Sequence, residues 1–423
     1  MTPQTKKRIE QIRRGEVPEG YKKTKIGIVP EEWETRSLSD ISAEITESVG
    51  TKELETLSIS AGIGFVNQAK KFGKELSGKQ YKKYTVLHKN DFSYNKGNSK
   101  KYPQGCIYRL IDREEAAVPD VFECFRINNQ NNIYFEQLFA SGFLNKELSK
   151  RINHGVRDNG LLNLTGRDFY KSAVMVPPLT EQKKIAEILQ TQDKLIALQQ
   201  KKIEELKKLK KAYLSKMFPK KGCNVPEIRF PGFTDPWEQR KLGDIASDMV
   251  AGGDIDKDLI LAEGQYPVIA NALTGDGIVG YYDKEYRVNA PAVTVTGRGD
   301  VGHAKARLVN FTPVVRLLSV KSEHDVFFLE NAINTLKIVI ESTGVPQLTV
   351  PQLAKYEVAF PRQLDEEEHI GAFFKQLDHL ITLHQRKLEE MKIYKKSLMQ
   401  LLLTGIVRIY HRKEEVKWIK KKS

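Results

Sequence analysis

Two stretches of the chain, residues 179–218 and 372–404, repeat apolar residues every three and four positions and contain no Pro or Gly. This spacing places the apolar side chains along one stripe of an α-helix, and a seven-residue repeat is typical of a coiled coil. We therefore predict two long helices joined along an apolar seam. The predicted seam residues are Leu189, Ile196, Ile203, Leu206, Tyr213 and Met217 in the first helix, and Phe374, Leu377, Ile381, Leu388, Met391, Leu398 and Leu402 in the second.

Polar residues interrupt both predicted seams at matching places, where Gln199 corresponds to His384 and Lys210 to Lys395. Isolated polar residues in a seam commonly fix its register and its partner. If the second helix packs antiparallel against the first, it returns to the domain that the first one left. The chain would then close around an approximate twofold axis. The alternative is that each stretch is a core helix of a larger bundle.

The chain contains an internal repeat, because both the helical stretches and the segments that open the two globular regions match each other. Each match holds at a constant offset, and the regions between them do not align by eye. We infer two copies of one unit, a globular domain followed by a long helix. The matching residues are Trp33, Glu34, Arg36, Leu38, Asp40 and Ile41 with Trp237, Glu238, Arg240, Leu242, Asp244 and Ile245, and Asp193, Leu195, Ile196, Gln200, Lys202, Glu204, Glu205, Lys207, Lys210 and Lys211 with Asp378, Leu380, Ile381, Gln385, Lys387, Glu389, Glu390, Lys392, Lys395 and Lys396.

Strand-like pieces alternate with Gly-rich turns in the second globular region, as in "ALTGDGIVGYYDKEYRVNAPAVTVTGRGDVGHAK". Together with the long helices, this pattern predicts an α+β fold of two globular α/β domains joined by two antiparallel coiled-coil helices. The expected segments are a basic N-terminal segment (1–30), a first globular domain (31–178), a central spacer helix (179–220), a second globular domain (221–363), a distal spacer helix (364–408) and a basic tail (409–423).

The composition is strongly basic, with 68 Lys and Arg against 54 Asp and Glu, for a net charge of +14. This excess indicates a polyanionic partner, either nucleic acid or an anionic membrane surface. No apolar run approaches the roughly 18–20 residues that a membrane span needs, and the N-terminus lacks the apolar core of a signal peptide. Three widely spaced cysteines fit a reducing cytoplasm and argue against a zinc module or a disulfide framework.

Residues 79–110 of the first domain combine many basic side chains with aromatic ones. Lysines neutralise phosphates, aromatic rings stack on bases or sugars, and Asn side chains read base edges. The segment "SYNKGNSKK" within it is predicted to be a turn that contacts nucleic acid. The alternative is a strand pair with a solvated lysine face. The candidate DNA-binding residues are Tyr94, Asn95, Lys96, Asn98, Lys100 and Lys101.

In the second domain, residues 293–305 read "VTVTGRGDVGHAK", a β-branched run followed by G-x-G-x-x-G. A dinucleotide site requires a helix directly after the third glycine, whereas residues 309–313 read as a strand leading to a turn. We interpret the glycines as a loop whose backbone closely approaches a phosphate or a base. A purely structural turn is the alternative. The candidate DNA-binding residues here are Arg298, His303, Lys305 and Arg307.

Other catalytic motifs are incomplete. "GKELSGKQ" resembles a P-loop but has Gln80 where Ser or Thr would bind Mg²⁺. Pro119-Asp120 begins like a nuclease motif, but Cys124 and Phe125 follow Glu123, and no N-P-P-Y or D-P-P-Y run of base methyltransferases is present. The acidic residues 365–368 and Glu181 are typical of helix N-termini, where the helix dipole favours negative charge. We therefore predict no catalytic residue and no metal ligand.

The chain resembles the DNA-specificity subunits of type I restriction-modification enzymes over nearly its whole length. The resemblance rests on the Trp-Glu-x-x-x-Leu-x-Asp-Ile segments at Trp33 and Trp237, the "VPPLTEQKKIAEIL" segment at 176–189, the two long helices, and "LLLTGIVR" at 401–408. The second copy departs from the pattern, because "FPRQLDEEEHI" lacks the Pro-Pro and Glu-Gln pairs.

This resemblance implies a cytoplasmic, non-catalytic subunit with two target-recognition domains, each reading one half of a bipartite double-stranded DNA target. It also implies two methyltransferase subunits that bind S-adenosylmethionine and methylate adenine. Two restriction subunits that use ATP and Mg²⁺ can join such a complex. No cofactor is expected on this chain itself, and no membrane contact is expected.

Two further expectations come from the residues. Because the domain interiors differ, the two half-sites should differ, which gives an asymmetric target. The helices should space the half-sites about one helical turn of DNA apart, roughly 34–36 Å. The alternatives are a stand-alone DNA-binding regulator, which would need no methyltransferase partner, and a nucleotide-using enzyme with its site at the Gly-rich loop.

Overall fold

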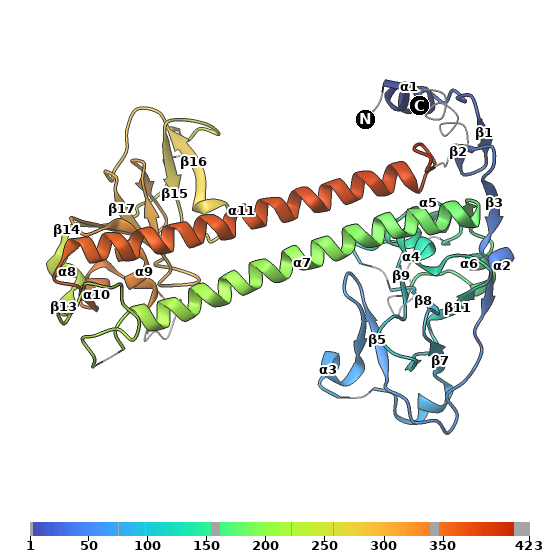
Figure 1. The fold of residues 1–423 in the computed structure, drawn as a ribbon, viewed down its shortest axis with the longest axis horizontal. Coiled ribbons are helices and arrows are strands. Elements are labelled where there is room, and N and C mark those ends of the chain that lie inside the picture. The colour runs from blue at the N-terminus through green and yellow to red at the C-terminus, as the bar shows by residue number, and fades with distance from the viewer. Residues whose placement is uncertain are drawn as a thin grey trace, which may run out of the picture. The chain divides into compact units, whose positions relative to one another are not determined.

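The computed structural model describes residues 3–74, 76–97, 99–153, 161–220, 222–256, 258–338 and 347–409. It divides into two compact units, each built from a globular domain and parts of both long helices. Unit 1 comprises residues 1–197 and 389–423, and unit 2 comprises residues 198–388. The long helices are α7 (Leu179–Met217) and α11 (Leu364–Leu402), shown in green and red in Figure 1.

The two long helices pair antiparallel within each unit. In unit 1, Lys395 Nζ lies 2.5 Å from a carboxylate oxygen of Asp193. In unit 2, Lys210 Nζ lies 2.7 Å from both carboxylate oxygens of Asp378. These ion pairs correspond in the internal repeat, since Asp193 matches Asp378 and Lys210 matches Lys395. Gln199 and His384, which occupy matching places in the two seams, also contact each other in unit 2, where Gln199 donates hydrogen bonds to Nδ1 (2.9 Å) and the carbonyl (2.8 Å) of His384.

The predicted seam residues all lie on the inner faces of these helices. Every one of the thirteen is buried or half-buried, whereas Leu195, Leu198 and Leu380, which lie off the seam, are 43%, 63% and 45% exposed. The heptad pattern therefore identified the face along which α7 and α11 pack. The ends of the seam enter the domain cores, where Leu189 and Leu402 belong to the core of unit 1 and Met217 and Phe374 to that of unit 2.

The domain of unit 1 is built around an antiparallel sheet with the strand order β4-β11-β8-β9. Helix α4 packs against this sheet, and its aromatic residues join the core. The elements are α1 (Pro3–Arg13), β1 (Tyr21–Thr24), β2 (Gly27–Pro30), β3 (Glu34–Ser37), α2 (Leu38–Ile41), β4 (Ser42–Glu44), β5 (Leu57–Ser60), β6 (Gly64–Asn67), α3 (Gln68–Phe72), the 3₁₀ helix η1 (Gly78–Lys83), β7 (Thr85–His88), β8 (Phe92–Asn95), β9 (Cys106–Arg109), β10 (Glu115–Val118), β11 (Glu123–Ile127), α4 (Asn132–Ala140), α5 (Asn145–Ser149), α6 (Gly166–Tyr170) and β12 (Ala173–Val176).

The domain of unit 2 has a corresponding sheet with the order β14-β20-β17-β18, and a second sheet with the order β16-β15-β19. Helix α9 packs against β17 and β18. The elements are β13 (Glu238–Lys241), α8 (Leu242–Ile245), β14 (Ala246–Ala251), β15 (Tyr266–Ile269), the 3₁₀ helix η2 (Gly275–Gly277), β16 (Ile278–Tyr282), β17 (Ala292–Val295), β18 (Ala304–Arg307), β19 (Thr312–Pro313), β20 (Leu318–Ser322), α9 (Val326–Asn334), α10 (Val350–Leu353) and β21 (Glu357–Phe360).

The internal repeat extends through the domain interiors, which the sequence alone did not reveal. The two four-stranded sheets have the same strand order relative to the sequence, so β4, β8, β9 and β11 correspond to β14, β17, β18 and β20. The hairpin registers also agree, because Phe92 pairs with Arg109 and Ala292 pairs with Arg307. Burial of the strands is retained while their side chains differ, and for this reason the sequences show no alignment.

Each long helix begins at a buried glutamate that is neutralised by an arginine. In unit 1, Glu181 accepts hydrogen bonds from Arg408 (2.8 and 3.0 Å) and from the indole N–H of Trp33 (2.9 Å). In unit 2, Arg229 donates to both carboxylate oxygens of Glu366, at 2.6 and 2.7 Å. These acids therefore do more than interact with the helix dipole, because a buried carboxylate needs a paired cation.

The N-terminal segment of unit 1 contacts the residues that follow α11. Arg8 donates a hydrogen bond to the carbonyl of Ile406 at 2.7 Å, and the Tyr21 hydroxyl donates to the carbonyl of Gly405 at 2.7 Å. These carbonyls lie just beyond the helix and need donors. Residues near the two ends of the chain thus meet in one packed unit.

Candidate nucleic-acid interface

A basic cavity of about 730 Å³ lies in unit 2, where the β17–β18 hairpin, the loop after β15, and α9 face α7 and α11. Its walls combine side chains that are far apart in sequence. The basic residues that line it are Lys207, Lys210, Lys211, His303, Lys305, Arg307, Lys375 and His379, and the acidic ones are Asp276, Glu330 and Asp378. The excess of positive charge is suited to phosphate groups.

Three of the four sequence-predicted residues of the second domain line this cavity. Lys305 and Arg307 alternate along β18 and therefore share one face of the strand, and His303, which directly precedes β18, also lines the cavity. Lys305 forms an ion pair with Asp276, and Arg307 donates hydrogen bonds to the hydroxyl of Thr294 (3.0 Å) and the carbonyl of Asp276 (3.0 Å). These contacts fix the direction of both side chains before any ligand arrives.

The fourth residue, Arg298, lies on the exposed turn and is not among the residues that line the cavity. Its guanidinium donates hydrogen bonds to the side-chain oxygen of Gln347, at 3.1 and 3.2 Å. It therefore stands at the surface of the same hairpin that carries His303, Lys305 and Arg307.

The G-x-G-x-x-G segment lies in the loop between β17 and β18, and β18 rather than a helix follows it. The close approach of its backbone to a partner stays a prediction, and the glycines also meet constraints within the chain. A Cβ on Gly297 would lie 2.3 Å from the carbonyl oxygen of Arg316, and one on Gly302 would lie 3.0 Å from Ile338. Gly299 and Gly302 also adopt left-handed backbone angles, with φ of 73° and 92°. Internal packing and turn geometry explain these glycines.

The charges in the cavity are perturbed by burial. Burial raises the pKa of Glu330 to about 7, although the nearby cations Lys210 and Lys305 oppose this shift. Burial also lowers the pKa of the Arg307 guanidinium from its usual value. Glu330 is therefore only partly ionised near neutral pH, and its partial negative charge reduces the net positive charge of the cavity.

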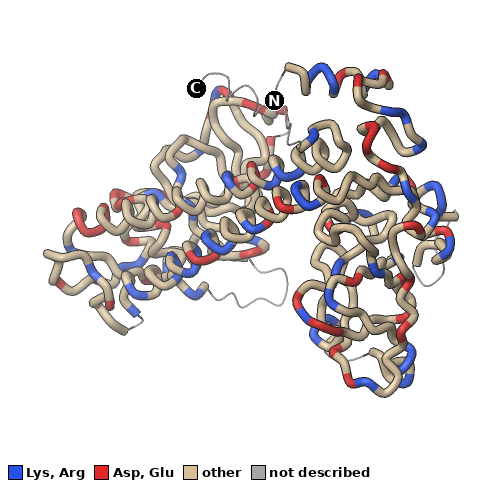
Figure 2. Tube along the Cα trace, turned by 45° about the vertical axis from the view of Figure 1, so that its right-hand side comes forward, with Lys and Arg blue, Asp and Glu red and all other residues tan. Residues whose placement is uncertain are grey.

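The long helices contribute basic residues to this surface that were not predicted from the sequence. Lys207, Lys210 and Lys211 of α7 and Lys375 of α11 line the cavity, and Figure 2 shows Lys and Arg positions recurring along both long helices. A signal was present in the sequence, because Lys207 and Lys211 lie off the apolar seam, Lys210 interrupts it, and all three recur as lysines in the second copy. Their matches are Lys392, Lys395 and Lys396.

The predicted basic turn of unit 1 connects β8 to β9, the hairpin equivalent to β17–β18. Lys100 and Lys101 are exposed, and the ammonium of Lys101 lies 5.7 Å from the centre of the Tyr102 ring. Asn95 instead accepts a hydrogen bond from the backbone of Gly97 (2.8 Å), which shapes the turn. Lys96 is mostly buried in an ion pair with Glu123 (2.5 Å). Asn98 lies outside the described residues.

Tyr94 departs from its predicted role at the surface. Its side chain is fully buried, stacks on Phe169 with ring centres 4.8 Å apart, and donates a hydrogen bond to the carbonyl of Gln104 (2.9 Å). In β8 the side chains alternate between the two faces of the sheet, and Tyr94 points into the core. Tyr94 therefore supports the turn from the core. The exposed Lys100 and Lys101 are the residues that we assign to the candidate interface.

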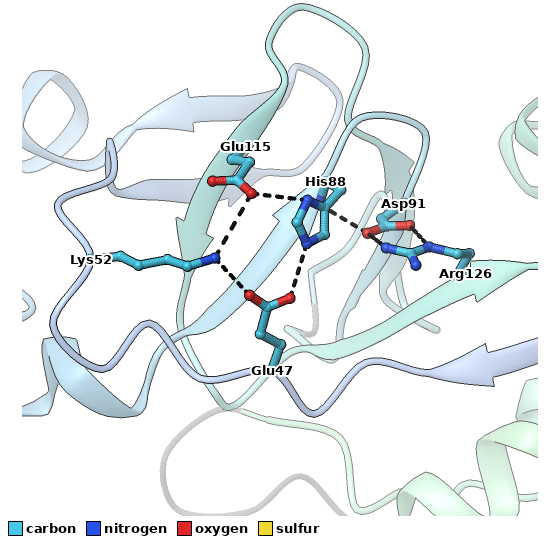
Figure 3. Close-up of polar contacts among 6 residues, drawn as sticks. All are labelled: Glu47, Lys52, His88, Asp91, Glu115 and Arg126. Carbon is cyan, nitrogen blue, oxygen red and sulfur yellow. Dashed lines mark hydrogen bonds and ion pairs between the residues drawn. The ribbon is translucent and has the colours of Figure 1, made fainter.

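A second charged cluster in unit 1 is self-neutralised, as Figure 3 shows. Glu47 contacts Lys52 (2.7 Å) and His88 (2.9 Å), while His88 also contacts Glu115 (3.1 Å). Hydrogen bonds from Lys52 and His88 lower the pKa of Glu47 to about 2. Because each carboxylate meets a cation, we interpret this cluster as an anchor between the β7–β10 pair and the loop before β5. A neighbouring ion pair joins Asp91 and Arg126 at 2.7 and 2.9 Å.

The part of the chain that the structure describes contains no group of three or more His, Cys, Asp or Glu side chains arranged to hold a metal ion. Among the helices of the described ranges, none is long and apolar enough to cross a membrane.

Comparisons with known proteins agree with this architecture. The family model described as the type I restriction modification DNA specificity domain matches twice, at residues 30–208 and 234–392. The protein described as the MjaX type I restriction enzyme specificity subunit of Methanocaldococcus jannaschii is 27% identical over 430 residues, covering 92% of this chain and 97% of the relative.

Solved structures share the fold. The crystal structure of a type I restriction-modification S subunit from M. genitalium aligns with a TM-score of 0.59 at 14% identity, covering 90% of this chain and 97% of that one. A chain from a study of complex assembly and conformational transition of a type I R-M system aligns with a TM-score of 0.55 at 16% identity, covering 90% and 99%. The two family-model matches span most of the sequence, and the chain therefore belongs to the type I restriction-modification DNA specificity family.

Proposed function

We propose that this chain selects the DNA sequence for a type I restriction-modification complex and reads a bipartite, asymmetric target in double-stranded DNA. The main observation that supports this proposal is that two domains with the same four-stranded sheet present different basic hairpins. Unit 1 presents Lys100 and Lys101 on its turn, and unit 2 presents His303, Lys305 and Arg307 at a basic cavity. A shared framework with different reading surfaces favours two different half-sites.

The paired helices support a role as a spacer between the half-sites. The seam continues along both helices, and the same ion pair braces it in unit 1 and in unit 2. A stiff pair of helices fixes the distance between two reading surfaces, whereas a flexible linker does not. We propose half-sites whose centres lie about one turn of DNA apart, roughly 34–36 Å.

The chemistry is assigned to partner subunits. We propose that the chain itself is not an enzyme and that two methyltransferase subunits bind it in the cytoplasm and supply S-adenosylmethionine for adenine methylation. Restriction subunits that use ATP and Mg²⁺ would complete the complex. Membership of the specificity family supports this proposal, as does the solved neighbour described as part of an assembling type I R-M system.

The decisive experiment maps methylated bases in cells that express the chain together with its methyltransferase partner, and in matched cells that lack only the chain. We expect methylation of one asymmetric two-part motif that disappears without the chain. A perfectly palindromic motif, or methylation that is independent of the chain, would contradict the proposal. Replacement of Lys305 and Arg307 by Ala should relax the sequence preference in one half of the motif and leave the other half unchanged.

A stand-alone DNA-binding regulator is the competing function, because the two basic surfaces would serve it equally well. Affinity purification of the tagged full chain separates the two functions. The proposal requires co-purification of a methyltransferase subunit in fixed proportion, whereas a regulator requires none.

A further inference from the structure

The hairpin of β5 and β6 in unit 1 carries an exposed aliphatic residue at its tip. Residues 61–63 connect the strands, and the side chain of Ile63 is 74% exposed. A single exposed aliphatic side chain is ordinary on a protein surface and needs no explanation by itself. The surroundings of Ile63 indicate a role for it, because the tip is held in place beside the basic turn between β8 and β9.

The backbone at the tip is fixed by contacts to the β8–β9 hairpin. The N–H of Gly62 donates a hydrogen bond to the Tyr108 hydroxyl at 2.7 Å, and the N–H of Ile63 donates to the carbonyl of Ser60 at 3.0 Å. Gly62 has φ of 84°, and a Cβ there would lie 3.0 Å from the Tyr102 hydroxyl oxygen. Glycine is therefore required for the close approach, and Ile63 is held in one place beside the turn.

Basic residues lie on the same hairpin and on the neighbouring turn. Lys71 donates a hydrogen bond to the carbonyl of Ile59 at 3.0 Å, so its ammonium lies against the same hairpin. Tyr102, which approaches Gly62, follows directly after Lys100 and Lys101 on the turn. An apolar tip with basic neighbours is suited to a DNA groove, where cations bind the phosphates and the tip reaches the bases.

Unit 2 repeats this arrangement with different residues. The corresponding hairpin, β15–β16, carries Leu273 in its connecting loop, and this side chain is 58% exposed and lines the basic cavity. Asn271 of the same loop accepts a hydrogen bond from the N–H of Gly297 on the β17–β18 turn at 2.7 Å. Each unit thus fixes an exposed branched aliphatic side chain against its basic hairpin, and the two copies are independent observations.

The chemistry of DNA limits what an aliphatic side chain can read. Most groups on the base edges are hydrogen-bond donors or acceptors, which an aliphatic side chain cannot recognise. The 5-methyl group of thymine is the apolar feature of the major groove, and it is the natural contact of an aliphatic side chain there.

We propose that Ile63 and Leu273 are specificity-determining residues, each of which packs against the methyl group of a thymine in the half-site of its own unit. This inference rests on the proposed function. It adds the feature of DNA that each unit reads through its apolar tip, and it assigns one thymine-bearing position to each half-site.

The test uses the full chain with its methyltransferase partner and the motif defined by the methylation experiment. Each thymine of the motif is replaced in turn by deoxyuridine, which lacks only the 5-methyl group. For the wild type, one replacement in each half-site should weaken binding about three- to fourfold, the effect of losing one buried methyl group. In I63A the replacement in one half-site should have no further effect, and L273A should be insensitive in the other half-site.

Ile111 provides the matched control, because it is also an exposed isoleucine (56%) but lies at the opposite end of β9 from the turn. I111A should bind like the wild type and retain the full response to deoxyuridine. The inference is overturned if no thymine is coupled to either residue, if the motif lacks thymine in one half-site, or if I111A behaves like I63A. Failure of the proposed function is distinguishable, since the wild type would then show no sequence preference at all.

Discussion

Units 1 and 2 place an arginine and a glutamate at equivalent positions but use them differently. Arg109 and Arg307 end corresponding strands, and Glu136 and Glu330 are each the fifth residue of the helix that packs on the sheet. In unit 1, Arg109 forms an ion pair with Glu136 at 2.6 Å. In unit 2, Arg307 turns to Thr294 and Asp276 and leaves Glu330 in the basic cavity.

This difference shows how one framework supports two surfaces. In unit 1 the ion pair of Arg109 and Glu136 joins β9 to α4 and stabilises the fold. In unit 2 the same positions face a cavity whose walls come from both the domain and the helices, so they become available to a ligand. A substitution at equivalent positions should therefore change folding in one unit and ligand binding in the other.

The largest expected effect is that of Arg109→Ala on unit 1. Removing the arginine leaves Glu136 without its cation in a site where the arginine is only 10% exposed, and we expect a loss of about 2–3 kcal/mol in unfolding free energy. Arg307→Ala should destabilise unit 2 by less than half of this. Hydrogen exchange of peptides that cover β9 and β18 measures the two effects separately. Equal losses in both units would refute the contrast.

The second effect is a stabilisation of unit 2 by Glu330→Gln at alkaline pH. The pKa of Glu330 is raised to about 7 by burial, so folding favours its protonated form. That contribution is complete below the unfolded pKa of about 4.5 and is lost as pH rises through 7. Because Gln stays neutral, E330Q should match the wild type at pH 4 and exceed its stability by about 2–3 kcal/mol at pH 8.

Glu136→Gln in unit 1 is the matched control for this pH experiment. It removes the carboxylate that pairs with Arg109, so it should destabilise at pH 8, the opposite sign to E330Q. Thermal unfolding and hydrogen exchange at both pH values provide the comparison. If E330Q loses stability at pH 8, then the neighbouring lysines stabilise the ionised form of Glu330. The interpretation that burial keeps Glu330 partly protonated would then be wrong.

The third effect concerns DNA affinity. Replacing Lys207 and Lys211 by Ala should weaken DNA binding about tenfold at moderate salt and reduce the slope of log affinity against log salt by about 2, since each lysine neutralises one phosphate. Lys201→Ala with Lys202→Ala on the same helix is the control, because neither lines the cavity. The loss should be the same for all sequences, and a loss confined to the specific motif would contradict a phosphate-binding role.

The smallest effect is that of Glu47→Gln in the self-neutralised cluster of unit 1. The residues are roughly 40% exposed, and exposed ion pairs contribute little, so we expect a loss below about 1 kcal/mol at pH 7. The pKa of Glu47 is lowered to about 2, so its contribution is present above pH 4.5 and is lost as pH falls through 2. The difference between variant and wild type should vanish in that acid range, with unit 2 peptides as the reference.

The sequence was informative wherever one periodic pattern decides the structure. The heptads identified the inner faces of α7 and α11, because burial along a helix repeats with the helix itself. The repeated motif singled out Trp33 and Trp237, and both indoles are buried in the core of their own unit. Lys305 and Arg307 were predicted as DNA-binding residues from their charge, and both lie on β18 and line the cavity, while their contact with DNA stays a prediction.

The sequence was uninformative where side chains from distant segments meet. Lys207 and Lys375 belong to different helices, and the cavity that they share depends on how those helices pack against β17 and β18. Tyr94 was misplaced because strand alternation, rather than residue type, decides which side chains of β8 reach the surface. The correspondence of β8 with β17 was hidden because the sheets retain burial and register but almost no identical residues.

The contact between the N-terminal segment and the end of α11 has a consequence for synthesis. Arg8 and Tyr21 are made before every residue of unit 2, whereas their hydrogen-bond acceptors at Ile406 and Gly405 are made after all of them. Unit 2 is contiguous and can complete its core while the chain is still growing. Unit 1 can form these hydrogen bonds only after residues 389–406 have been made, so a chain arrested within that stretch would hold a complete unit 2 and an incomplete unit 1.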